Sequence, residues 1–313
     1  MSDACCGVGA VREGAACGAS APACLPAGFR EFWELRAQAA RALGAGDVSM
    51  APVACASPAA RYAELVVAAP GARSLRARYV RPATDEAVPL VLAFPDWYQG
   101  VRGWHHLTRF VALGAAVVML DARLLGWDAL DITAGWEQAP EGLAVAGAYT
   151  DALRLSEAAL ELPGIDRTRV CTWGEGLGGA AAIAVAALVG DATWRCAALN
   201  PLPAGLEAVG TLPAAGPLAG IARAYRACDP TRARESELAG ALAYVDAANL
   251  ASMLEGELVL GTGAFDEQAP AAGQDLVAER ARAAASVRQV RYPRHGHERI
   301  NEFENELIGI FSR

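Results

Sequence analysis

One stretch near the middle of the chain constrains the fold more than any other: the segment from Arg169 to Gly179 and the apolar run behind it. Val170 to Trp173 is a short run of strand-forming residues, and closely spaced glycines follow it directly. The run from Ala180 to Val189 is rich in alanine and apolar throughout. This order predicts a strand, a sharp turn and a buried helix.

Two kinds of site are built on a strand, a tight turn and a helix. In a nucleophile elbow, with the pattern G-x-S-x-G, a strained turn lifts a serine above the end of a sheet. In a dinucleotide loop, with the pattern G-x-G-x-x-G, glycines let the backbone approach a pyrophosphate. Gly174, Gly176 and Gly179 satisfy the second pattern, and the elbow pattern fits with Gly176 where serine would stand.

The rest of the chain alternates predicted strands with predicted helices. After a first helix at 29–43, strands are expected at 65–68, 75–80, 88–94, 116–121, 169–173, 195–200, 257–262 and 287–292. Helices are expected at 104–113, 141–162, 178–189, within 216–254, at 271–285 and from Glu298 onward. The alternation predicts an α/β fold with a mostly parallel, twisted sheet, helices on both faces and an N-terminal helical extension. We expect one domain over residues 25–313, preceded by a poorly ordered Gly/Ala/Cys tail over residues 1–24.

Composition excludes several classes of function. The formal net charge of -8 and the scattered arginines argue against nucleic-acid binding. No apolar run is long enough to cross a bilayer, and the amino terminus does not resemble a secretory signal, so we expect a cytoplasmic protein without membrane contact. The chain has no lysine, which excludes lysine Schiff-base chemistry. The 8 cysteines form no C-x-x-C pair, so we expect free thiols, no metal and no cofactor.

Two further residues stand where a hydrolase with a nucleophile elbow needs them. In such enzymes the nucleophile is followed along the chain by an acid and then by a histidine, each after a strand. Asp266 follows the predicted strand 257–262, and His297 follows the predicted strand 287–292. A carboxylate placed there could hold the imidazole in the required tautomer. We therefore predict Asp266 and His297 as the acid and base of a catalytic site beside Gly176.

Several separated motifs give the chain a resemblance to one family from about Leu25 to the carboxyl terminus. The segment Phe29 to Trp33 is similar to a D-F-D-E-F-W motif, and Tyr149 to Arg154 is similar to a D-A-V-R-A helix. Tyr244 to Asn249 resembles Y-F-D-x-x-N, 263–266 resembles G-L-M-D, 296–298 matches G-H-E, and 98–100 stands where H-G-Y-N-G is found. The chain thus resembles the acetyl xylan esterase and cephalosporin C deacetylase family of carbohydrate esterases. The resemblance implies an α/β-hydrolase fold and a small-molecule or oligosaccharide acetyl ester as substrate. It also makes assembly into a homo-oligomer plausible.

The departures from this family fall on the reactive positions. The family's G-G-S-Q-G-G elbow is replaced by residues 174–179, so Gly176 stands at a degenerate nucleophile position. Arg123 alone remains of an R-G-Q motif, and Asp96-Trp97 replaces the H-G before the oxyanion-hole tyrosine. Tyr98 and Leu177 are assigned to oxyanion or substrate binding. A carboxylate at Asp96 would oppose the negative charge of a transition state formed nearby.

Three functional hypotheses follow. The first is a degenerate esterase, a pseudoenzyme for serine-type catalysis, because glycine keeps the turn but has no nucleophile. The second is an active hydrolase in which Asp266 and His297 activate water. The third is a non-catalytic ligand-binding or structural subunit. Glu175 is expected to point away from the cleft, and a dinucleotide enzyme is disfavoured because Glu175 would face the pyrophosphate.

Other histidines and tryptophans have simpler interpretations. His105 and His106 are adjacent on a predicted helix and point in different directions, so we interpret them as helix-start residues and not as metal ligands. The tryptophans near the predicted strand ends are interpreted as core residues, with a sugar-stacking platform as the alternative. They are Trp97, Trp104, Trp127 and Trp136.

Overall fold

The computed structural model is built on a single 10-stranded mixed sheet. It describes residues 10–13, 25–43, 48–55, 57–71, 73–96, 99–121, 134–209, 216, 227–228, 230–231 and 234–310. The strand order is β1-β10-β9-β8-β7-β5-β6-β4-β3-β2. The six neighbouring strands from β10 to β6 run parallel to one another, and the strands outside them pair antiparallel.

The parallel centre of the sheet lies close to where the sequence predicts it. Its strands are β5 (Val88–Phe94), β6 (Ala116–Leu120), β7 (Ile165–Glu175), β8 (Arg195–Leu199), β9 (Glu257–Gly263) and β10 (Ser286–Tyr292). Every residue of β5 and β6 is buried, as expected for strands covered on both faces. The antiparallel side is formed by β4 (Arg73–Pro82), β3 (Ala60–Ala69) and β2 (Val48–Pro52).

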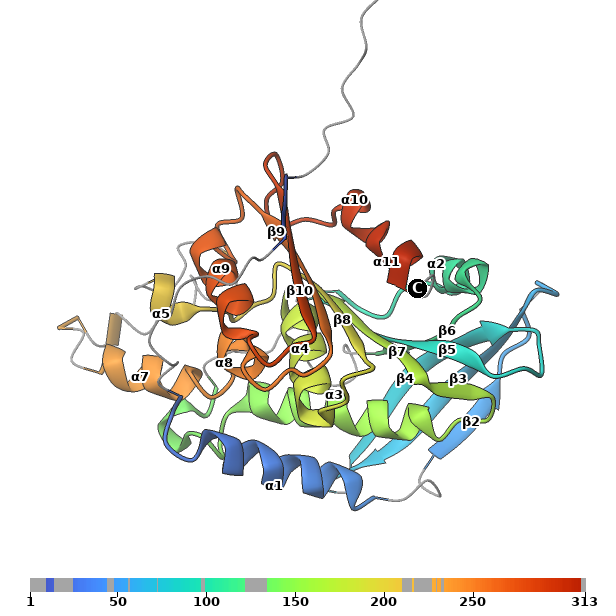
Figure 1. Ribbon diagram of the computed structural model, residues 1–313. Coiled ribbons are helices and arrows are strands. Elements are labelled where there is room, and N and C mark those ends of the chain that lie inside the picture. The colour runs from blue at the N-terminus through green and yellow to red at the C-terminus, as the bar shows by residue number, and fades with distance from the viewer. Residues whose placement is uncertain are drawn as a thin grey trace, which may run out of the picture.

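Helices cover both faces of the sheet (Figure 1). One face packs against α1 (Phe29–Arg41), α3 (Ala144–Leu160), α4 (Leu177–Val189), α7 (Glu235–Leu242), α8 (Ala247–Ala251) and α9 (Ala271–Arg280). The other packs against α2 (Trp104–Thr108), the 3-10 helix η2 (Arg109–Leu113), α10 (Asn301–Glu304) and α11 (Glu306–Ile310). Short helical turns also occur at η5 (Trp136–Gln138) and α5 (Leu206–Val209).

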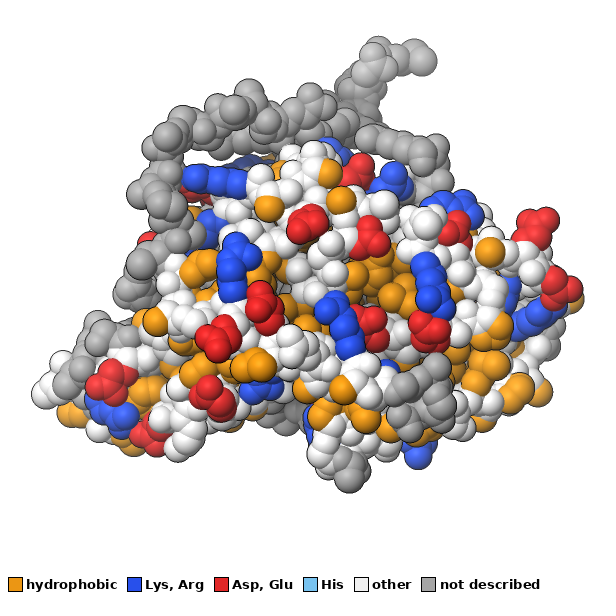
Figure 2. All heavy atoms as spheres, turned by 60° about the horizontal axis from the view of Figure 1, so that its bottom comes forward, with side chains coloured by type: hydrophobic (Ala, Val, Ile, Leu, Met, Phe, Trp, Pro, Cys, Tyr) orange, Lys and Arg blue, Asp and Glu red, His pale blue; other side chains and the backbone are white. Residues whose placement is uncertain are grey.

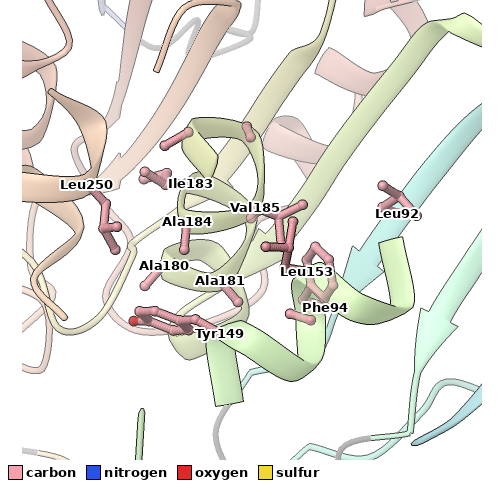
Figure 3. Packing of buried hydrophobic residues seen from close by; sticks show 14 of the residues in the cluster. Leu92, Phe94, Tyr149, Leu153, Ala180, Ala181, Ile183, Ala184, Val185 and Leu250 are labelled. Atoms are coloured by element: carbon pink, nitrogen blue, oxygen red, sulfur yellow. The ribbon is translucent and has the colours of Figure 1, made fainter. Parts of the chain in front are cut away.

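Helix α4 is the packing centre of the larger layer (Figure 3). Its residues from Leu177 to Ala187 are all buried, against β5, α3 and α8. Tyr149 and Leu153 of α3 lie against its alanines, which are small enough to let the helices approach closely. This packing fixes the start of α4, where the predicted elbow lies.

The structure differs from the sequence predictions mainly at the edges. Within the predicted tail, Ala10–Glu13 forms β1 and pairs antiparallel with β10. The edge strand β2 was not predicted, because four of its five residues are exposed and it lacks the pattern of a half-buried strand. The predicted helix 104–113 divides into α2 and η2, and the last helix begins at Asn301.

The charge distribution on one face bears on the partners of the chain. Figure 2 shows arginine and acidic side chains interspersed over the face that lies at the bottom of Figure 1. Among the described residues on this face, neither sign of charge forms a continuous patch, and phosphate binding requires a basic one. In the part of the chain that the structure describes, no helix is both long and apolar enough to cross a membrane.

Candidate active site

The predicted elbow forms a sharp turn between β7 and α4. Gly176 has φ 53° and ψ -121°, a conformation that costs a residue with a side chain about 1–3 kcal/mol and that glycine adopts freely. Its N–H donates to the carbonyl of Leu199, and its carbonyl accepts from Leu202 and Ala180. The turn is therefore held from β8 and from α4, and it has the strained geometry that an elbow requires.

A carboxylate from the neighbouring strand end fills the space at this turn. Asp96 follows β5 and is buried. A Cβ atom added to Gly176 would lie 1.8 Å from Asp96 Oδ1. The same oxygen accepts a 2.9 Å hydrogen bond from the backbone N–H of Leu177. The Asp96 carboxylate thus takes the place where a nucleophile side chain would begin, and it binds the backbone donor expected to serve an oxyanion.

His297 lies between two carboxylates. Its Nδ1 is 2.7 Å from Asp266 Oδ2, and its Nε2 is 3.2 Å from Asp96 Oδ2. Asp266 is itself fixed, because its Oδ1 accepts hydrogen bonds from the backbone N–H groups of Gln268 and Ala269. The predicted acid and base therefore meet beside Gly176, and the third partner of the histidine is Asp96.

The two carboxylates determine the charge of the imidazole. Burial lowers the pKa of His297, but hydrogen bonds to Asp266 and Asp96 and the charges of both carboxylates outweigh burial and raise it to about 10. The imidazole is therefore protonated at neutral pH, with both ring nitrogens donating. In this state His297 cannot accept a proton from water or from a hydroxyl.

Asn200 connects the loops that carry the acid and the base. Its Oδ1 accepts from the N–H of Gly263 at the end of β9, and its Nδ2 donates to the carbonyl of Gly296 beside His297. Asn200 is a non-glycine residue with positive φ, 45°, which asparagine tolerates better than most residues. Sequence reasoning missed this role, although an asparagine at the carboxyl end of a predicted parallel strand was a usable signal.

Glu175 corrects one expectation from the sequence. It was expected to point away from the cleft, yet it lines a cavity of about 30 Å³ together with Asp96, Gly176, His297 and Arg299. The reason is that β7 stays extended as far as Glu175, so the side chain lies on the same face as Trp173, below the loop that leads to α10. The cavity has room for one or two water molecules.

The negative charge of Glu175 is destabilised by its surroundings. Burial raises its pKa to about 7, the charges of Asp96 and Glu304 add to the rise, and Arg102 opposes it. The nearest Arg102 nitrogen is 3.8 Å from Glu175 Oε2, and Oε1 has no hydrogen-bond partner among the described residues. Glu175 therefore gains or loses its proton near neutral pH.

The remaining predicted residues are placed as follows. Tyr98, Trp97, Trp127 and Arg123 lie outside the described residues. Trp104 packs under Arg78 and Trp136 under Arg234, so both rings have cationic partners. His295 contacts Glu298, and burial with nearby arginine charges lowers the pKa of His106 to about 4.

The sheet, the sharp turn after β7, Asp266 after β9 and His297 after β10 together define an α/β-hydrolase fold with these residues at the carboxyl ends of the strands. The chain belongs to the acetyl xylan esterase family, whose model matches residues 20–312.

Solved structures of acetyl xylan esterases have a similar fold. Acetyl xylan esterase 1 from Thermoanaerobacterium sp. JW/SL YS485 is 21% identical with a TM-score of 0.83, over 94% of this chain and 96% of that chain. Acetyl xylan esterase from Paenibacillus sp. R4 is 18% identical with a TM-score of 0.82, over 91% of this chain and 94% of that chain. Dipeptidyl peptidase 4 from Porphyromonas gingivalis is 17% identical with a TM-score of 0.59, over 81% of this chain and 35% of that chain. A search of curated proteins gave no match.

Proposed function

We propose that this member of the acetyl xylan esterase family has lost hydrolysis of acetyl esters by serine-type acyl transfer. The observation that carries the proposal is the Asp96 carboxylate, which fills the side-chain space of Gly176 and binds the Leu177 N–H. Acyl transfer needs a hydroxyl nucleophile and a free oxyanion donor, and this arrangement supplies neither at the elbow. We expect the protein not to hydrolyse acetyl sugars or the acetyl ester of a cephalosporin.

The charge of His297 argues against water activation in the resting site. A general base must be neutral to take a proton, whereas the pKa of His297 is raised to about 10. The charges of Asp96 and Asp266 hold the proton in place. The arrangement therefore supports an esterase fold that does not attack acetyl esters with Asp266, His297 and water alone.

The experiment measures acetate release from 4-nitrophenyl acetate and from acetylated xylo-oligosaccharides, together with labelling by a fluorophosphonate serine probe. The expected result is a rate equal to that of buffer and no labelling. Turnover that disappears in His297→Ala would contradict the proposal and favour water activation. Turnover that survives in His297→Ala would locate the activity elsewhere in the chain.

A further inference from the structure

The two oxygens of Asp96 have different roles in the site. Oδ1 accepts from the Leu177 N–H at 2.9 Å, which is the donor that would bind a developing oxyanion. Oδ2 lies 3.2 Å from His297 Nε2, on the side where the nucleophilic atom would lie. The carboxylate is therefore oriented as an acyl group is in an esterase, with one oxygen in the oxyanion position and the other at the reactive position.

The stability of the product that a carboxylate nucleophile forms indicates which substrates it can attack. Attack on an acetyl ester would produce an anhydride, which is less stable than the ester that it replaces. Attack on a saturated carbon that bears a leaving group produces an alkyl ester, which is stable until water cleaves it. That alkyl ester would have its carbonyl oxygen on the Leu177 N–H and its carbonyl carbon beside His297, so the site's own esterase machinery would act on it.

We infer that Asp96 is a covalent nucleophile toward small, unhindered alkyl halides, so that the site performs a hydrolytic dehalogenation. The inference rests on the proposed absence of serine-type acyl transfer, because both depend on the Asp96 carboxylate at the elbow. A halide suits the geometry, because the leaving group departs on the side of the carbon opposite to Asp96. His297, on the Asp96 side, could not protonate it there, and a halide needs no proton.

The first step forms a bond between Asp96 Oδ2 and the substrate carbon. The carbon–halogen bond breaks, and the halide leaves with the bonding electron pair. Asp96 becomes a neutral alkyl ester and loses its negative charge. One of the two carboxylates that raise the pKa of His297 is thereby removed, so the imidazole releases its proton to solvent more readily.

The second step hydrolyses this ester. Neutral His297, held by Asp266, takes a proton from a water molecule whose oxygen attacks the Asp96 carbonyl carbon. The charge that develops on Oδ1 is stabilised by the Leu177 N–H, and the alcohol leaves with the proton from His297. The Asp96 carboxylic acid that remains then gives its proton to His297, which restores the carboxylate and the protonated imidazole of the starting state. The cavity of about 30 Å³ beside Asp96 and His297 has room for this water. The sum of the steps converts alkyl halide and water into alcohol, halide and a proton.

The first experiment traps the intermediate with bromomethane, a halide small enough for the cavity beside Asp96. In His297→Gln the second step has no base, so a methyl group is expected to accumulate on the peptide that contains Asp96 and to be seen by mass spectrometry. Asp96→Asn should abolish both this adduct and bromide release. Asp85→Asn is the matched control, because the Asp85 side chain is 92% exposed and pairs with Arg61. An adduct on cysteine peptides alone, or none, would overturn the inference.

The second experiment uses the unmodified protein and so does not depend on the folding of a variant. In a single turnover in heavy-oxygen water, the heavy atom should enter the Asp96 carboxylate and not the alcohol. Heavy oxygen in the first alcohol formed would show direct attack by water and would refute the nucleophile. Acetate release and bromide release are separate measurements, so failure here is distinguishable from failure of the proposed function.

Discussion

The edge of the sheet that carries the candidate site has two halves, and their carboxylates have different contacts. The loops after β9 and β10 carry Asp266 and His297, which are in hydrogen-bond contact with each other. The loops after β5 and β7 carry Asp96 and Gly176, where the Asp96 carboxylate fills the space that a side chain at position 176 would occupy. The first half places a histidine beside an acid, and the second places a second acid where a nucleophile elbow needs space for a side chain.

The comparison shows that retained geometry does not by itself preserve a residue's chemical role. His297 has the partner and the position of a general base, but Asp266 and Asp96 together raise its pKa to about 10 and keep it protonated. Its protonation state therefore depends on both halves of the site. Asp266 also accepts two backbone hydrogen bonds at its Oδ1, and Asp96 accepts one at its Oδ1 from the Leu177 N–H.

The largest effect is expected from removing Asp266. Asp266→Ala leaves one buried and one partly buried backbone N–H group and His297 without their acceptor, and we expect a loss of about 3–5 kcal/mol in the free energy of unfolding. Asp96→Ala should cost less, about 1–2 kcal/mol, since Asp96 Oδ2 lies 3.2 Å from His297 Nε2, whereas Asp266 Oδ2 lies 2.7 Å from His297 Nδ1. Urea unfolding of both variants measures the difference, with Asp85→Ala as the exposed control. Equal losses would show that the two halves support the fold equally.

The second prediction concerns pH. The pKa of His297 is raised from 6.5 to about 10 in the folded chain, so its stabilising contribution is complete below pH 6.5 and is lost as the pH rises to about 10. The stability difference between the wild type and His297→Gln should therefore shrink over this interval in urea unfolding. In Asp96→Asn, which has one carboxylate fewer at the imidazole, the loss should be smaller and should be complete at a lower pH, because the folded-state pKa of His297 is lower. If the pH midpoint of this loss were the same in Asp96→Asn as in the wild type, Asp96 would not contribute to keeping His297 protonated.

The third prediction restores a side chain at the elbow. Gly176→Ser should destabilise the chain by about 1–3 kcal/mol from backbone strain, with a further cost from the clash with Asp96. Gly71→Ser is the matched control, because Gly71 has φ 78° and open space around it. Adding Asp96→Ala should remove the clash and leave the strain. Acetate release by Gly176→Ser alone should stay weak, and a robust rate would show that Asp96 does not block the site.

The smallest effect is expected at Glu175. Its folded-state pKa is raised to about 7, so ionising it costs stability as the pH rises from about 4.5 through 7. Glu175→Gln removes this cost and should stabilise the chain by about 1–2 kcal/mol at pH 8 and hardly at all at pH 4.5. Glu161→Gln, at an exposed ion pair, should show no such dependence. Equal stability of wild type and Glu175→Gln at pH 8 would contradict the claim that ionising the buried Glu175 side chain costs stability.

Much of the fold could be predicted because its local signals agree with one another. The strand 88–94 is a continuous apolar run, and the structure has β5 at the same residues. The positions of Asp266 and His297 could be derived because each follows a strand of the parallel sheet, whose carboxyl ends meet at one edge. The family itself was identified from the motifs and is shown by the family match.

The contacts between loops could not be predicted in the same way. The sequence indicated a carboxylate near the oxyanion position, but not that Asp96 would fill the side-chain space of Gly176, since that depends on how two strand ends approach each other. Glu175 was misplaced because its direction depends on where β7 stops being extended. The short strand β1 was missed because its pairing with β10 is made across the whole length of the chain.

The narrow approach of β5 to the elbow has a consequence for which pairs of residues the fold can accept. A Cβ atom at position 176 and the carboxylate at position 96 would be 1.8 Å apart, so the fold has room for one of them. A chain with serine at position 176 could not hold Asp96 in this conformation. Glycine at 176 is therefore a precondition for the carboxylate, so that a substitution at position 176 and one at position 96 cannot be tolerated independently of each other.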